Sequence, residues 1–157
     1  MKKIFILSLM LVYIASTGCG YKILDSGETE NFNIKELKTS GDKRINFKIK
    51  NSLIINTSGN KTHNLAMEIY TEKKKEIKEK NIKNQITKYK IILNSYVKVN
   101  FLEKNRKEEF NITSIGDYQV ASQYSTTLNN EKRLIEDLTN EISDKIKKKI
   151  NLILNDF

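Results

Sequence analysis

The feature that most constrains the fold is a strict alternation of side chains over residues 89–101. One set of alternate positions is mostly apolar, and it comprises Tyr89, Ile91, Leu93, Ser95, Val97, Val99 and Phe101. The facing set is polar, and it includes Lys88, Lys90, Asn94, Lys98 and Asn100. Period-two alternation of this length predicts a long strand with one buried side and one side in water.

A second constraint is an apolar stripe near the C-terminus, where hydrophobic residues recur every three or four positions. The stripe consists of Leu134, Ile135, Leu138, Ile142, Ile146, Ile150 and Ile153. Acidic residues gather in the earlier half of this segment and lysines in the later half, which suits the helix dipole. The pattern predicts a long amphipathic helix that packs on a sheet, with a membrane-surface helix as the alternative.

The segments before the long strand predict a strand, a helix and a second strand. Residues 32–37 read as a strand with Phe32 and Ile34 on one face. Asp42 is a candidate N-cap for a helix that runs to about Ile55, with the turn residues 56–61 after it. A strand follows over residues 65–70, and the charged run 73–83 predicts a solvent-facing hairpin.

After the long strand, residues 103–106 predict a turn, and a fourth strand starts at Phe110 and breaks near Gly116 and Asp117. The expected element order is β-α-β-β-β-α. Both helices can then cover one face of a four-stranded sheet, which gives an α+β two-layer sandwich over residues 32–157.

The N-terminus has the pattern of an export signal. Met1-Lys2-Lys3 is basic, and Ile4–Ile14 is an uncharged apolar run of 11 residues, too short to cross a bilayer. Small residues follow up to Gly18, and Cys19 is the only cysteine of the chain. Residues 1–18 therefore resemble a bacterial lipoprotein signal peptide, with Ser16 where leucine is usual; a plain secretory signal is the alternative.

In this interpretation Cys19 becomes the lipid-accepting first residue of the mature chain. A diacylglyceryl thioether and an N-acyl chain on Cys19 would anchor the protein stably. Residues 19–31, which include the polar stretch 25–31, would form a lipidated flexible tether. Gly20 rather than Asp follows the cysteine, so we expect attachment to the outer membrane on its periplasmic face.

The search for catalytic or cofactor chemistry finds no assembled motif. His63 is the only histidine and lies in a polar stretch, so a metal site or a catalytic triad has no local support. Residues 58–61 read as a turn and not as a phosphate loop. We therefore expect no enzymatic activity and no cofactor apart from the lipid on Cys19.

A net charge of +9 raises the question of an anionic partner. Nucleic acid is one candidate, because a four-stranded sheet with aromatic residues can form an RNA-binding platform. An export signal argues against nucleic acid, and compositional drift toward lysine on solvated faces is the alternative explanation for much of the charge.

The order of these parts resembles the lipopolysaccharide-assembly lipoprotein family, LptE, in its alphaproteobacterial form. The resemblance rests on Cys19-Gly20-Tyr21, on residues 116–126 (GDYQVASQYST), which are similar to a stretch before the last helix of that family, and on the helix pattern of residues 131–146. The chain departs from the family in lacking Arg-Pro-Leu-Tyr after the cysteine and in having lysine for most arginines of that helix.

The resemblance implies a non-enzymatic protein that plugs and supports an LptD-like outer-membrane β-barrel and contacts lipopolysaccharide. Lys78, Lys80 and Lys83 flank the expected hairpin and could meet lipid phosphates as point charges, or could simply be solvated. The alternative function is a generic basic periplasmic lipoprotein that acts as a scaffold or adaptor for another envelope complex.

Overall fold

A computed structural model of the chain describes residues 32–55 and 63–156. The expected signal peptide, the tether and the turn 56–61 lie outside the described residues. Four strands and two helices follow the order β-α-β-β-β-α, which confirms the predicted fold class. In chain order they are β1 (Phe32–Gly41), α2 (Lys43–Ile55), β2 (His63–Lys80), β3 (Ile86–Phe101), β4 (Arg106–Gln119) and α3 (Tyr124–Asn155).

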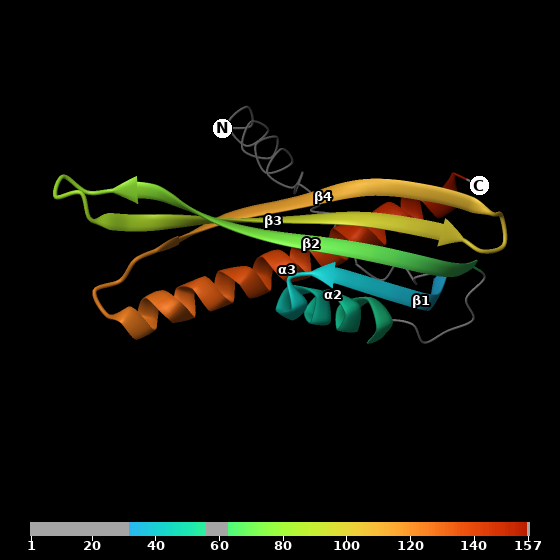
Figure 1. The fold of residues 1–157 in the computed structure, drawn as a ribbon, viewed down its shortest axis with the longest axis horizontal. Coiled ribbons are helices and arrows are strands. Elements are labelled where there is room, and N and C mark those ends of the chain that lie inside the picture. The colour runs from blue at the N-terminus through green and yellow to red at the C-terminus, as the bar shows by residue number, and fades with distance from the viewer. Residues whose placement is uncertain (1–31, 56–62, 157) are drawn as a thin grey trace, which may run out of the picture.

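The four strands form one sheet in the order β1-β2-β3-β4. β1 pairs with β2 in parallel, and the other two pairings are antiparallel. A parallel pair needs a crossover connection, and α2 supplies it. Both helices lie on the same side of the sheet, with α3 running along most of its length and the β2–β3 hairpin projecting beyond it (Figure 1). No helix of residues 32–55 or 63–156 covers the other side of the sheet, which we call the open face.

The hydrophobic core lies between the sheet and the two helices. The alternation in residues 89–101 is confirmed, because Ile91, Leu93, Ser95, Val97, Val99 and Phe101 are all buried. The stripe on α3 faces them, with Leu138, Ile142, Ile146 and Ile150 almost fully buried. Burying each such side chain contributes about 1.5–3 kcal/mol, so this interface is the main source of stability.

The connection from β1 to α2 depends on two residues. Gly41 has a φ of +94°, a conformation that favours glycine, and any Cβ there would approach the Thr71 carbonyl oxygen. Asp42 then caps α2 as predicted, since its Oδ1 accepts hydrogen bonds from the backbone N–H of Arg44 (3.0 Å) and of Ile45 (3.2 Å).

α2 turns its predicted apolar positions Ile45, Ile49 and Leu53 into the core. Phe47, which the sequence places near the same face, is instead largely exposed. It follows Ile45 by two positions, which is about 200° around a helix, so it lies on the opposite side.

All four strands are longer than the sequence predicts; β1, for example, continues past residue 37 to Gly41. β2 continues through the charged run to Lys80, so the hairpin turn contains only residues 81–85. β4 runs unbroken through Gly116 and Asp117, and the expected break is wrong. Gly116 has a packing reason instead, because a Cβ on it would lie 2.6 Å from Leu134 Cδ1 on α3.

α3 begins at Tyr124, so the end of the family-like stretch 116–126 is helical. Its first turn holds no acidic residue and its last turn no basic one, which corrects the expected match to the helix dipole. Thr127 fixes the start of the helix, because the Ala121 N–H donates to its Oγ1 at 2.9 Å.

Candidate functional site

The sheet extends well beyond β1 and α2 at one end, and we call this part the hairpin end. It comprises the turn 81–85, the adjoining halves of β2 and β3, the end of β4 and the first turns of α3 (Figure 1). The hairpin strands and the start of α3 meet at this end of the sheet, as the ion pair between Lys75 Nζ and Glu131 Oε2 (2.7 Å) shows.

The turn itself is built by asparagine side chains. Asn81 Oδ1 accepts hydrogen bonds from the backbone N–H of Lys83 (2.9 Å) and of Gln85 (3.0 Å), and the Asn81 N–H donates to the Gln85 carbonyl. Asn84 adopts a φ of 59°, a region that asparagine tolerates better than most residues. The turn is therefore well defined and presents Ile82 and Lys83 at its tip.

The three candidate lipopolysaccharide-binding lysines have different surroundings. Lys78 forms an ion pair with Asp117 of β4, which compensates its charge. Lys80 Nζ donates to the Asn84 side-chain oxygen at 3.0 Å. Among the described residues the Lys83 ammonium has no partner, so it is the cation of the three most available to an anionic ligand.

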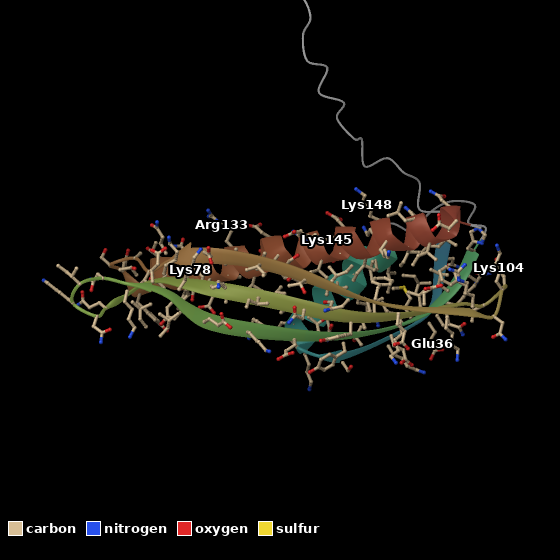
Figure 2. All side chains as sticks on the ribbon, turned by 90° about the horizontal axis from the view of Figure 1, so that it is seen from above. Glu36, Lys78, Lys104, Arg133, Lys145 and Lys148 are labelled. Carbon is tan, nitrogen blue, oxygen red and sulfur yellow. The ribbon has the colours of Figure 1, made fainter. Side chains whose placement is uncertain are left out.

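Lys78 lies at the far end of the molecule from Lys104 in the β3–β4 turn, as Figure 2 shows. Across β2, β3 and β4, lysines near Lys78 are also paired with acidic residues. Lys88 lies 2.8 Å from Glu79, and Lys90 lies 3.9 Å from Glu76. The hairpin end is thus rich in lysine, but most of that charge is locally balanced.

A second cluster joins the hairpin end to α3 on the helix side of the sheet. Glu131 Oε2 accepts hydrogen bonds from Lys75 Nζ and from the Tyr118 hydroxyl, both at 2.7 Å. The Lys75 ammonium lies 4.3 Å from the centre of the Tyr89 ring, and the Tyr89 and Tyr118 rings stack at 5.5 Å. We call these four residues the α3 clamp.

The α3 clamp shifts the pKa values of Glu131 and Lys75. Partial burial acts to raise the pKa of Glu131, but hydrogen bonds from Lys75 and Tyr118 outweigh it and hold the pKa below its usual value. Burial alone would lower the pKa of Lys75, yet the hydrogen bonds to Glu131 and Tyr118 raise it. Both groups are therefore held in their charged forms, as a structural contact requires.

The α3 clamp adds polar contacts to the hydrophobic core, which in this half of the molecule includes Ile91 and the clamp's own Tyr118. The helix-facing positions of β2 change from Leu65, Met67 and Ile69 to Lys73, Lys75 and Ile77 once β1 has ended. The sequence analysis did not find the clamp, because its members come from four separate elements. The feature that would have revealed the clamp is the register of β2 with β3. It pairs Lys75 with Ile91, so both side chains lie on the helix side of the sheet and face α3.

Two other residues singled out in the sequence, Cys19 and His63, are not part of the hairpin end. Cys19 lies outside the described residues. His63 begins β2 instead of lying in a turn, and its Nδ1 is 3.3 Å from Glu103 Oε2. Over residues 32–55 and 63–156, no three His, Cys, Asp or Glu side chains group so as to hold a metal ion.

In the part of the chain that the structure describes, no helix combines the length and the apolar character needed to cross a bilayer.

Comparison with known proteins finds similarity in fold but not in sequence. No protein-family model matches the chain, and no curated protein matches it. The crystal structure of rare lipoprotein B from Shewanella oneidensis is similar, with a TM-score of 0.59 and 12% identity over 79% of this chain and 98% of that chain. The solution structure of an uncharacterized lipoprotein B from Nitrosomonas europaea has a TM-score of 0.55 and 8% identity over 82% of this chain and 90% of that chain. At such identities the likeness establishes a shared fold.

Proposed function

We propose that this chain is a lipid-anchored envelope protein of the lipopolysaccharide-assembly type, carried on the periplasmic face of the outer membrane. The observation that carries the proposal is the coincidence of two independent features. Cys19 follows a lipoprotein-like signal in the sequence, and the folded body has the architecture of proteins named lipoproteins.

The proposed partner is an LptD-like β-barrel that the chain plugs and supports. A long, narrow two-layer body with one chain end tethered to the membrane suits insertion along a barrel axis (Figure 1). The role is non-enzymatic, and the lipid on Cys19 is the one covalent group that the function requires. Nucleic acid is not a partner in this proposal.

Lipopolysaccharide contact is proposed at the hairpin end. Lys83 is the leading candidate because no acidic side chain in the described part of the chain compensates its charge, and Lys80 is the second because its partner there, the Asn84 side-chain oxygen, is neutral. Lys78 contributes less, since Asp117 already occupies it. A lysine meets a phosphate as a compact point charge, so the contact would be electrostatic and salt-sensitive.

Depletion and rescue in the native host test this proposal. Depletion should reduce lipopolysaccharide at the cell surface, measured by surface labelling, and the parent chain should restore it while Cys19→Ser should not. A Ser26→Ala chain, changed in the tether but not at the lipid acceptor, serves as the matched control. Normal surface lipopolysaccharide in depleted cells would instead favour a scaffold for another envelope complex.

A further inference from the structure

The open face of the sheet contains a shallow trough that the proposed function leaves unused. Two adjoining cavities of about 370 and 380 Å³ lie on this face and share Lys38, Glu68 and Lys98 in their walls. Glu36 at the rim lies on the side of the sheet away from both helices (Figure 2). We call the two cavities together the open-face trough. Their volumes fall in the range of small-molecule sites.

One end of the open-face trough is aromatic. Tyr70 of β2 and Tyr96 of β3 are directly paired in the sheet and are 46% and 50% exposed. Their ring centres lie 6.1 Å apart and the rings are tilted by 41°. Two neighbouring rings with free faces offer a platform for an apolar surface, and their hydroxyls add polar groups at its edge.

The other end of the open-face trough is polar and offers both donors and acceptors. Lys38 lies 3.1 Å from Glu36 and 3.9 Å from Glu68, and Lys98 lies 2.9 Å from Glu109. The side-chain oxygen of Asn100 is buried in this wall and has no hydrogen-bond partner among the described residues. Because this oxygen has almost no accessible surface, the groups that a ligand in the trough can reach are the carboxylates and ammonium groups.

The charge of the open-face trough differs from that of the whole chain. The chain carries +9, whereas the walls of the trough contain three lysines and four glutamates. A local balance slightly on the acidic side disfavours nucleic acid, an anionic bilayer or a phosphate cluster at this face. It suits a ligand that is uncharged overall and rich in hydrogen-bonding groups.

We propose that the open-face trough binds a saccharide. Sugar rings present C–H surfaces that pack on tyrosine faces, and hydroxyls that donate to carboxylates while accepting from lysine. This inference deepens the proposed function and rests on it only for the source of the sugar, because lipopolysaccharide is a glycolipid. The hairpin end would then contact phosphates, and the open face would contact sugars.

The test uses the intact protein, purified from membranes in a detergent without a sugar headgroup, and saturation-transfer NMR on the sugar. The probes are an oligosaccharide core released from lipopolysaccharide and a tetramer of N-acetylglucosamine. Both should receive saturation from the parent protein. A Tyr70→Ala/Tyr96→Ala variant should bind at least tenfold more weakly, and Tyr96→Phe, which keeps the ring, should bind like the parent.

Tyr124→Ala is the matched control, because Tyr124 is 75% exposed at the start of α3 and away from the trough. Tighter binding of the core oligosaccharide identifies lipopolysaccharide as the source, and tighter binding of the tetramer identifies a cell-wall sugar. The proposal is overturned if neither probe binds, if the double variant binds as well as the parent, or if Tyr124→Ala loses as much. If the protein binds sugar but no barrel partner is found, the saccharide site in the trough stands and the role in lipopolysaccharide assembly is rejected.

Discussion

At the scale of single residues, the contact between Gly116 and Leu134 sets how closely α3 approaches β4. A Cβ at position 116 would lie 2.6 Å from Leu134 Cδ1 and 3.4 Å from Leu138 Cδ2. We predict that Gly116→Ala destabilises the protein by about 1–3 kcal/mol, the range for overpacking a core. The free energy of unfolding in urea measures this.

Leu134→Ala provides the control for that prediction. Alone it should destabilise the protein by leaving space between α3 and β4, whereas in the Gly116→Ala background it should remove the clash. The two changes are then non-additive, with the double variant more stable than the sum of the single effects predicts. Additive effects would mean that Leu134 is not what excludes a side chain at position 116.

The cap of α2 gives a second prediction at this scale. Asp42→Ala removes the acceptor for two backbone N–H groups and should cost about 1 kcal/mol in the free energy of unfolding. Asp42→Asn keeps a capping oxygen without the charge, and it should lose much less. An equal loss in both variants would assign the effect to the ion pair with Lys73, at 3.8 Å, and not to the cap.

The three hairpin lysines can be ranked by their surroundings. Lys83→Gln should weaken the binding of lipopolysaccharide more than Lys78→Gln, because Lys78 is already paired with Asp117. Binding of fluorescent lipopolysaccharide to the purified protein at low and high salt measures the difference. A larger effect at Lys78 would contradict the ranking.

At the scale of elements, the α3 clamp couples the hairpin end to α3. Because the pKa of Glu131 is lower in the folded protein than in the unfolded chain, its contribution is present above about pH 4.5 and is lost as the pH falls through the folded pKa. We predict that Glu131→Gln lowers the free energy of unfolding by about 1 kcal/mol at pH 7 and by much less near pH 3. Urea unfolding of parent and variant at both pH values tests this.

Glu136 supplies the matched control for the α3 clamp. It forms an ion pair with Lys48 at 2.8 Å, and its pKa is also lowered, but its side chain is 51% exposed. Solvent screens such a pair, so Glu136→Gln should have no measurable effect at either pH. A difference for Glu131→Gln that does not change between pH 7 and pH 3 would refute the electrostatic account of the clamp.

The elements whose sequence prediction failed share a physical cause. Periodicity predicts a strand only where one of its faces is apolar and buried. The charged half of β2 lies beyond β1 and α2, so its residues pair with β3 without showing an apolar alternation in the sequence. From its neighbours in the sequence alone, Gly116 predicts a break in the strand. Its role is instead to make room for Leu134, which is 18 positions away in the chain. Tertiary contacts decide both cases.

At the scale of the whole molecule, the two-layer fold could be predicted because its core obeys two clear periods. The alternation over residues 89–101 and the stripe on α3 each give one apolar face. Each face is buried by packing on the other, which gives two layers. The candidate site was less predictable. Sequence placed Lys78, Lys80 and Lys83 at one hairpin, but the partners that distinguish them lie up to 39 residues away. The open-face trough was not foreseen at all, because Tyr70 and Tyr96 meet only through strand register.

The most direct test of the central claim is to isolate the full-length protein from its native host. The protein is tagged, extracted from the envelope in mild detergent, and analysed by mass spectrometry for co-purifying proteins and for its own N-terminal peptide. We predict an acylated Cys19 and a large outer-membrane β-barrel in equal stoichiometry. An N-terminus that is not acylated at Cys19, or an acylated protein that brings down no barrel, would contradict a role in lipopolysaccharide assembly.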